Sequence, residues 1–450
     1  MDKWPKEIEK LASKINAGGG QLYLVGGAVR DILMGREVKD WDFTTNLEPQ
    51  QILSIFPKNS FYNNIYGMVG VVLGDKTVFE VTTFRTDYGY SDSRHPDVVN
   101  WGKTIEEDLA RRDFTINAMA YRLTVNSYEL RVDREKVIDL YGGIGDLDNK
   151  IVRAVGEADK RFGEDALRML RAIRIASELG FVIEEKTFDS IVRNALNLGN
   201  VSGERIKTEF WRILLSPTPV DAVKLLKNSG LLEVFIPELM LAVGVKQKGH
   251  HIDDVWNHLL KTLAGCQSQH PITRLACLLH DVAKPMVMKG EGEARTFHNH
   301  EVVGARVAMK VAERLKLSKV EREMLFRLVR WHMFTASELQ TDRAVRRIIR
   351  NVTPEYLQEL VAMRRADRVG SGAKETSWRW ELLKKRFDEV QKQPFGVKDL
   401  KVDGHDVMKI LKIKPGRRVG EILDKLFAQV EEDPKLNERE ILVEKIKKMI

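Results

Sequence analysis

Residues 22–42 read LYLVGGAVRDILMGREVKDWD and hold the pattern that decides the fold. The first four residues predict a buried strand, and Gly26 and Gly27 then let the backbone approach an anionic ligand. Residues 29–34 predict a short helix that ends at the next glycine, so that amides near its start and Arg30 could face phosphate oxygens. An ion pair between Arg30 and the next residue is the alternative. The segment therefore predicts a strand, a phosphate-binding turn and a helix.

Two carboxylates follow this turn, and a third lies further along the chain. On a strand, Asp40 and Asp42 would point to one face and could share one or two magnesium ions, while Trp41 would turn into the core. Glu80 lies in the alternating stretch 78–85, which predicts a strand that could pair beside the first and aim Glu80 at the same face. The alternative for Glu80 is an exposed strand glutamate. Three such carboxylates predict nucleotidyl transfer, in which metals neutralise charge and Glu80 assists the attacking hydroxyl.

Four further motifs follow in order, and with the first they carry a resemblance to a known family. The chain resembles the class II tRNA nucleotidyltransferases and the related bacterial poly(A) polymerases. In this family the second motif handles the ribose and triphosphate of the incoming nucleotide, and the third forms a hinge between head and neck. The motifs are similar to residues 111–119 (with Arg111, Arg112, Asp113 and Asn117), 139–147, 164–171 and 204–209.

The fourth motif contains Asp165, Arg168 and Arg171, which would lie in one row on a helix. A carboxylate accepts from an exocyclic amine and a guanidinium donates to a ring nitrogen or carbonyl, so the pair can imitate a Watson–Crick partner. The resemblance implies that these side chains select CTP or ATP without a nucleic-acid template. The alternative is a helix-surface ion pair, which contributes only about 0.3–0.5 kcal/mol.

The segment between Arg85 and Asp108 is rich in Gly, Ser, Asp and Tyr and predicts a mobile loop. In the resembled family a flexible loop at this place helps the site to change from C to A addition. Its length here favours an enzyme that adds A, and the complete CCA, over one that stops after CC.

The composition is compatible with an intracellular RNA-binding enzyme of several domains. The 450 residues exceed one usual core, and 73 basic against 65 acidic residues leave a formal charge of +8. Two cysteines, Cys266 and Cys277, give neither a disulfide framework nor a CxxC metal pair. No apolar run is long enough for a signal core or a membrane span, so we expect a cytoplasmic protein without a membrane partner.

Eight of the ten histidines lie between His250 and His332, after a Gly/Lys/His segment at 244–251 that predicts a domain boundary. Their order, together with two aspartates, resembles the HD superfamily of helical metal-dependent phosphohydrolases. Imidazole and carboxylate ligands suit manganese, nickel, iron or zinc, and a metal-bound water would attack a phosphate ester. The resemblance implies a metal site at His258, His280, Asp281 and Asp367, with His300 and His332 completing a second position.

These patterns predict an α+β fold: a nucleotidyltransferase head with a small mixed β-sheet, then helical neck, body, HD and tail regions. We expect the head at 1–150, the neck and body at 151–245, the HD domain at 246–370 and the tail at 371–450. The resemblance implies CCA addition to tRNA 3′ ends from CTP and ATP, with Mg²⁺ at the head and a divalent transition metal at the HD site.

Four alternatives remain open on the sequence. The first two are an enzyme that adds only A or only CC to tRNA, and a poly(A) polymerase. The third is an HD phosphohydrolase whose head merely binds RNA. The fourth, a non-enzymatic RNA-binding factor, is disfavoured because binding does not require clustered acids beside a phosphate site.

Overall fold

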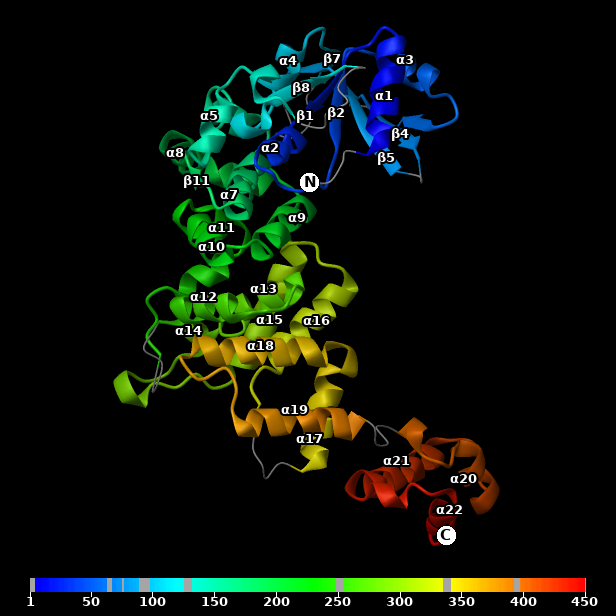
Figure 1. Ribbon diagram of the computed structural model, residues 1–450. Helices are drawn as coiled ribbons and strands as arrows, with labels where there is room; N and C mark the ends of the chain where they lie inside the picture. The colour runs from blue at the N-terminus through cyan, green and yellow to red at the C-terminus, as the bar shows by residue number, and fades with distance from the viewer. Residues whose placement is uncertain are drawn as a thin grey trace. The chain divides into compact units, whose positions relative to one another are not determined.

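The computed structural model describes residues 5–62, 67–74, 77–88, 98–124, 132–247, 254–334, 341–391 and 397–449. It divides the chain into two compact units (Figure 1). Unit 1 comprises residues 1–237 with 314–316, and unit 2 comprises residues 238–313 with 317–450. The division into head, neck and body, HD and tail at residues 150, 245 and 370 remains a prediction.

Unit 1 begins with the predicted mixed sheet, which has seven strands in the order β3-β4-β5-β2-β1-β8-β9. β2 and β5 run parallel, and the other neighbouring pairs run antiparallel. Leu22 to Val25 form β1 as predicted, and every residue of that strand is buried. The strands are β1 Leu22–Val25, β2 Asp42–Thr45, β3 Ser60–Tyr62, β4 Met68–Leu73, β5 Thr77–Thr83, β8 Met119–Leu123 and β9 Val137–Asp139.

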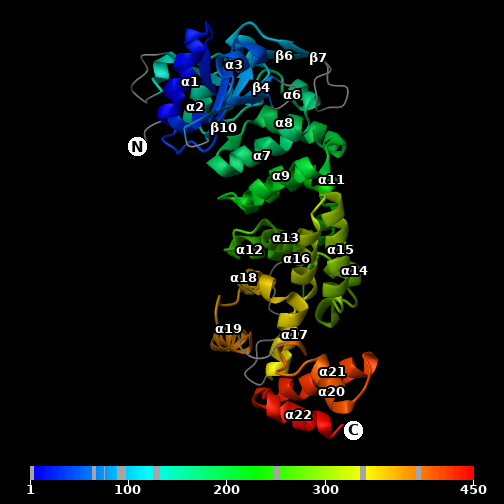
Figure 2. The same cartoon turned by 90° about the vertical axis from the view of Figure 1, so that its right-hand side faces the viewer.

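Helices α1 (Lys6–Ala17) and α3 (Pro49–Ile55) lie side by side on the sheet (Figures 1 and 2). In α1 the buried residues are spaced three or four apart, which places one apolar stripe toward the sheet. Trp41 packs against the same core, as predicted. This core fixes β1, β2 and β5 and therefore the residues at their ends.

Part of the predicted mobile loop is ordered secondary structure. β6 (Arg85–Tyr88) and β7 (Val98–Trp101) pair antiparallel, and α4 (Ile105–Ala110) follows. A capping box begins α4, because Thr104 accepts from the Glu107 amide while the Glu107 side chain accepts from the Thr104 amide. Residues 89–97, at the centre of the expected loop, lie outside the described residues.

The rest of unit 1 is mostly helical, with one two-stranded parallel pair, β10 (Ile151–Val152) and β11 (Val182–Ile183). Residues 161–179, an amphipathic stretch of the sequence, are split between two helices. A second amphipathic stretch, residues 201–215, contains α9. The other helices of unit 1 are α2 Gly27–Leu33, α5 Gly143–Asp148, α6 Ala158–Glu164, α7 Leu167–Leu179, α8 Glu185–Asn194, α9 Gly203–Leu214, α10 Pro219–Asn228 and α11 Leu231–Phe235.

Unit 2 contains only helices and short turns in its described part, and α12 packs against α13 and α18, while α13 packs against α16 (Figure 2). Its last three helices enclose a separate apolar core that includes Val407, Leu426 and Leu442. The helices are α12 Val255–Gly265, α13 Pro271–Leu279, α14 Lys284–Val287, α15 His300–Arg314, α16 Lys319–Arg330, α17 Asp342–Val352, α18 Leu357–Gly370, α19 Trp378–Gln391, α20 Gly404–Leu411, α21 Arg417–Glu432 and α22 Arg439–Lys447.

Short 3₁₀ turns connect many of these elements: η1 Thr115–Asn117, η2 Arg134–Lys136, η3 Ala195–Asn200, η4 Pro237–Ala242, η5 Gly292–Ala294, η6 Pro354–Tyr356, η7 Val397–Asp399 and η8 Pro434–Leu436. Within the described ranges, no helix has the length and apolarity that crossing a membrane requires.

Candidate active site in the head and metal centre in the second unit

Two carboxylates of the head lie side by side on the neighbouring parallel strands β2 and β5. Asp42, the first residue of β2, is paired in register with Glu80 of β5. Neighbouring residues in register point to the same face of a sheet, so Glu80 shares the face of Asp42 as predicted.

Asp40, in contrast, lies two residues before β2 and not within it. The ladder explains this, because β1 pairs with β2 only from Phe43 onward and β5 pairs only from Asp42 onward. The expectation that Asp40 and Asp42 lie on one strand and therefore share a face is wrong, because Asp40 is outside β2. The Asp40 charge nevertheless reaches Asp42, since it helps to raise the pKa of that carboxyl.

The pKa of Asp42 is raised above its usual value, first by reduced hydration and then by the negative charges of Glu80 and Asp40. Arg112 and Arg171 act in the opposite direction, because a nearby cation favours the ionised carboxylate. A further cation beside Asp42 would relieve the repulsion among the carboxylates. The donor set therefore suits a hard divalent ion such as Mg²⁺, which prefers carboxylate oxygen.

The Gly26 turn lies directly beside Asp42. Gly26 has a φ of 68°, and a Cβ there would lie 2.8 Å from Nη1 of Arg112 and 3.7 Å from Oδ2 of Asp42. Only glycine adopts this conformation without strain and leaves that space open. The α2 helix begins at the next residue, so the strand, the turn and the helix occur in the predicted order.

Arg30 of α2 bridges two motifs. Its Nη1 donates to Oδ1 of Asn117 at 2.7 Å, and its Nε donates to Oδ1 of Asp31 at 2.9 Å. The Arg30 side chain is 14% exposed, so its pair with Asp31 is not a freely solvated surface pair. The first and second motifs are thus in direct contact.

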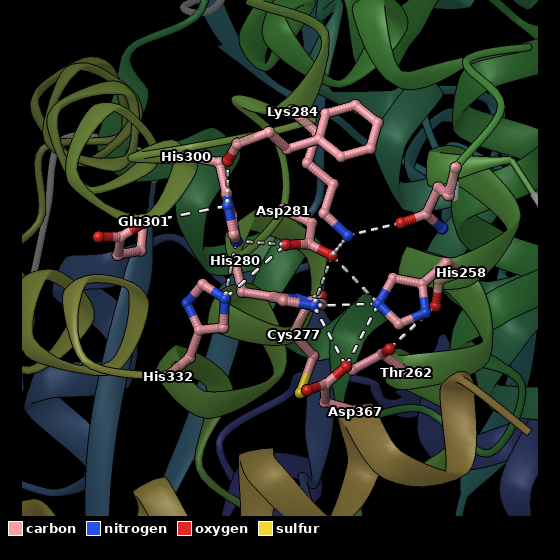
Figure 3. A network of polar contacts seen from close by, with 12 residues as sticks. His258, Thr262, Cys277, His280, Asp281, Lys284, His300, Glu301, His332 and Asp367 are labelled. Atoms are coloured by element: carbon pink, nitrogen blue, oxygen red, sulfur yellow. Dashed lines mark hydrogen bonds and ion pairs between the residues drawn. The ribbon is translucent and has the colours of Figure 1, made fainter. Parts of the chain in front are cut away.

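Six buried side chains gather in unit 2 (Figure 3). They come from α12, the end of α13, the start of α15, the end of α16 and α18. All six were predicted, and the structure divides them into two groups. Within each group the ligand atoms lie within 4.8 Å of one another. The groups are His258, His280 and Asp367, and Asp281, His300 and His332.

Asp281 joins the two groups. Its Oδ2 lies 3.3 Å from Nε2 of both His258 and His280, and its Oδ1 lies 3.1 Å from Nε2 of His300. Within the groups, the Nε2 atoms of His258 and His280 are 3.1 Å apart, and those of His300 and His332 are 3.3 Å apart. The two groups would hold divalent metal ions through these imidazole and carboxylate atoms.

Backbone carbonyls orient three of the imidazoles. The Nδ1 atoms of His280, His300 and His332 lie 2.8–3.0 Å from the carbonyl oxygens of residues three positions earlier. An Nδ1–H that donates to a carbonyl leaves the Nε2 lone pair for a metal, which is the usual outer-shell arrangement of histidine ligands. The ring nitrogens that face the centre are therefore the ones able to bind it.

The pKa values of these histidines diverge because of their different neighbours. Burial lowers the pKa of His280, but the charges and hydrogen bonds of Asp281 and Asp367 raise it to about 10. Burial and the charge of His280 lower the pKa of His332 to about 3. The pKa of Asp281 is held well below its usual value, because the charges of His280 and Lys284 outweigh burial. A buried cluster that contains an ionised carboxylate is suited to a bound cation.

Comparison with known proteins agrees with both sites. The chain matches the poly A polymerase head domain at residues 22–153, the probable RNA and SrmB-binding site of polymerase A at 180–242, and the HD domain at 255–371. It is 31% identical over 459 residues to a CCA-adding enzyme of Ligilactobacillus salivarius, covering all of this chain and 98% of that protein. The chain belongs to the CCA-adding enzyme family.

Two further members of the CCA-adding enzyme family illustrate the similarity. A Geobacillus thermodenitrificans CCA-adding enzyme is 42% identical over 229 residues, which cover 51% of this chain and 54% of that protein. The crystal structure of the Bacillus stearothermophilus CCA-adding enzyme in complex with CTP superimposes with a TM-score of 0.72 at 28% identity. That match covers the whole chain and 98% of the other chain.

Asp108 lies just before the second motif of this CCA-adding enzyme family member and pairs with both arginines of that motif. The buried Asp108 carboxylate accepts from Arg111 at 2.6 Å and from Arg112 at 3.0 Å. Burial raises the pKa of Asp108, but the charges and hydrogen bonds of the two guanidinium groups outweigh burial. The pKa of Asp108 is therefore below its usual value. Sequence reasoning missed Asp108, although its position three and four residues before the arginines on a helix signals the pairing.

Asp113 and Arg171 form a contact between the second and fourth motifs. Arg171 Nε donates to Oδ2 of Asp113 at 2.8 Å, and Asn117 Nδ2 donates to Oδ1 at 3.2 Å. Burial opposes ionisation of Asp113, but Arg171, Arg168 and these hydrogen bonds hold its pKa well below the usual value. Arg171 is therefore directed to Asp113, and the row that it was expected to extend is replaced by this ion pair.

Asp165 and Arg168 do not share one regular helix. Asp165 lies in the break between α6 and α7 with φ −149°, where its Oδ1 accepts from the amide of Leu167 at 3.0 Å. Arg205 of the fifth motif donates to Oδ2 of Asp165 at 2.7 Å, while Arg168 contacts Glu164 at 2.6 Å. The helix break separates the two side chains that sequence spacing had placed on one face.

The fifth motif lies against α7. Buried Arg174 of α7 donates from Nε to Oε2 of Glu209 in α9 at 2.6 Å, and also contacts Glu178. This pair links α7 and α9. Arg174 itself was not predicted, because its contact to Glu209 spans 35 residues.

Lys284 is the residue of the metal centre that sequence reasoning missed. Its Nζ lies 2.6 Å from Oδ2 of Asp281 and donates to Oε1 of Gln247 at 2.5 Å. The signal was present, because Lys284 follows Asp281 by three residues and can return to the same face of a helical turn. Lys284 supplies a positive charge at the position where Asp281 joins the two groups.

Proposed function

We propose that the head catalyses the nucleotidyl transfer of this CCA-adding enzyme, in which a tRNA 3′ hydroxyl attacks the α-phosphate of CTP or ATP and releases pyrophosphate. The observation that carries the assignment is the register pair Asp42 and Glu80 beside the Gly26 turn. Asp40 and Asp42 would hold Mg²⁺, which neutralises charge that develops on the triphosphate. Glu80 would orient the attacking hydroxyl.

The surrounding residues would bind the nucleotide. The backbone at Gly26 and Gly27, together with Arg30, would meet the triphosphate, and Arg111 and Arg112 would donate to its oxygens. Asp108 supports this role, because its carboxylate holds both guanidinium groups in place through charge-assisted hydrogen bonds. The ribose and phosphates would thus meet side chains that are already positioned.

Base selection would use Asp165 and Arg168. Arg205 fixes the Asp165 carboxylate, whose remaining lone pairs would accept from the exocyclic amine that cytosine and adenine share. Arg168 would exchange its contact with Glu164 for the base. Arg171, Asp113 and Asn117 form the support that joins this helix to the triphosphate site.

The test uses tRNAs that end before the first C, after CC and after CCA, with Mg²⁺ and with CTP and ATP supplied separately and together. We expect extension of the shortest tRNA to CCA and no further, resolved at single-nucleotide length. Addition of only the final A, of only CC, or of a long A tail would instead assign the corresponding alternative. We further propose that the protein works in the cytoplasm, where tRNA and both nucleotides are available.

We propose a second activity for unit 2, a metal-dependent phosphohydrolase. The six buried ligands favour this activity. They form two groups that Asp281 connects, and each group combines imidazole and carboxylate atoms that suit divalent transition metals. A bound metal would lower the pKa of a water and make it a nucleophile. Lys284 would attract the phosphate.

Metal analysis and hydrolysis of a generic phosphodiester, with manganese, nickel, iron or zinc added in turn, test this second activity. Hydrolysis that disappears in His280→Ala and persists in Asp42→Ala would support it. Metal binding without hydrolysis would leave unit 2 with a binding role only.

A further inference from the structure

Unit 2 contains a pocket of about 480 Å³ between α17 and α21 whose lining includes three arginines. Arg343, Arg347 and Arg350 of α17 line it, together with Thr341 and Asn351 at the two ends of that helix. Glu431 of α21 is its one acidic lining residue among those described. None of the sequence motifs includes this pocket.

The three arginines form one row because of the way α17 packs. Its apolar residues Val345, Ile349 and Val352 are buried, which turns the opposite face outward. Arg343, Arg347 and Arg350 are spaced by four and three residues on that outer face and are all exposed. At 1.5 Å per residue the row extends over about 10 Å, longer than a single small anion needs.

The pocket carries more positive charge than its own acid can neutralise. Arg350 and, at 3.9 Å, Arg343 contact the Glu431 carboxylate, and the buried Arg346 donates to the Glu431 carbonyl. Within the described part of the chain, Arg347 has no carboxylate at ion-pair distance. Arg343 also lies 3.7 Å from Glu432, an exposed residue beside the pocket. Three arginines against these two glutamates still leave an excess of positive charge, which lies at Arg347 in the centre of the row.

We propose that this pocket binds consecutive backbone phosphates of tRNA, a proposal that rests on the function proposed above. Planar guanidinium groups bind phosphate with two donors each, and a row of them follows a charged backbone without reading its sequence. Among the described residues no aromatic side chain lines the pocket, which favours binding of the backbone over stacking of unpaired bases. Thr341 and Asn351 would add neutral hydrogen bonds at the ends of the row.

The experiment measures tRNA affinity of the full-length protein over a range of salt concentrations, for Arg347→Gln and for the charge reversal Arg347→Glu. Arg347 is chosen because its replacement breaks no ion pair of the pocket. Arg417→Gln is the matched control, since Arg417 lies at the other end of α21, pairs with Glu421 and has 93% of its side chain exposed.

We expect Arg347→Gln to weaken tRNA binding about twofold to fivefold, as for one exposed ion pair, and to reduce the slope of log affinity against log salt by about one. Arg347→Glu should have a larger effect in the same direction, and Arg417→Gln should have none. In steady-state kinetics, the KM for tRNA should rise while kcat and the KM for CTP stay unchanged.

Glu431→Gln tests the same proposal with the opposite sign. Removing the charge of Glu431 breaks the ion pair of Arg350 and leaves Arg343 with Glu432 alone, so tRNA affinity and the salt slope should both increase. Unchanged affinity and slope in both Arg347 variants would overturn the proposal, even if CCA addition is intact. Loss of nucleotide addition from the wild-type protein would instead overturn the proposed function and leave the binding result to be judged separately.

Discussion

The two acidic sites of this protein are built in opposite ways. In the head, Asp42 and Glu80 are exposed residues on neighbouring strands, and Asp40 lies just before β2. In unit 2, six buried ligands are fixed by helix packing, and three of the histidines are oriented by backbone carbonyls. A site that must admit a triphosphate and an RNA end stays open, whereas a site that retains its metal can be enclosed.

The largest expected effect is in the head. Asp42→Ala should lower CTP and ATP incorporation by at least about a thousandfold, because it removes a ligand for the ions that stabilise the transition state. Incorporation by single-turnover assay is the measurement, and the metal content of unit 2 should stay unchanged. Asp148→Asn, an exposed aspartate of the same unit, is the control. Full incorporation by Asp42→Ala would remove the head from the chemistry.

The reciprocal change is expected to affect only unit 2. His280→Ala should reduce divalent metal affinity at least about a hundredfold, since loss of an outer-shell partner alone costs 10- to 100-fold. Metal content by elemental analysis and affinity by calorimetry check this. CCA addition should proceed at the wild-type rate. A parallel loss of nucleotide addition would mean that the two sites are coupled.

The contact between the second and fourth motifs gives the head a specific pH dependence. Asp113 has a pKa held below its usual value in the folded protein, so its contribution to stability is present above the unfolded pKa of about 4 and is lost as pH falls through the folded value. Asp113→Asn should destabilise the head by roughly 3 kcal/mol at pH 7 and flatten the dependence of stability on acid below pH about 4. Denaturant unfolding at several pH values measures both. An unchanged acid limb would contradict the assignment.

The smallest expected effect separates strain from site geometry. Gly26→Ala and Gly35→Ala both place alanine at positive φ, 68° and 67°, and both should lose about 1–2 kcal/mol of stability. Only at Gly26 does the added methyl meet Arg112, since nothing lies within 4 Å of a Cβ at Gly35. Nucleotide KM should therefore rise in Gly26→Ala alone. An equal rise in both variants would assign the effect to backbone strain.

Local pattern accounts for much of the head. The apolar run Leu22 to Val25 before the glycine turn predicts a fully buried strand. The alternation around Glu80 predicts a strand with one buried face, because period-two patterning places alternate residues on opposite faces. The position of Asp40 outside β2 was not predictable in this way, since it depends on where neighbouring strands stop pairing. The break at Asp165 likewise follows from a side-chain cap and from Arg205, which lies 40 residues away.

By itself, the sequence determined which residues could bind metal, phosphate and base, because ligand type and local spacing are written in the chain. Only the tertiary structure decided how they are grouped: Asp281 between two triads, Arg171 on Asp113, and the arginine row facing Glu431. It also placed the thiols of Cys266 and Cys277 within hydrogen-bonding range of each other, although their spacing suggested no pair. Such contacts join residues from different helices, and helix packing, which depends on the whole apolar surface, sets their distance.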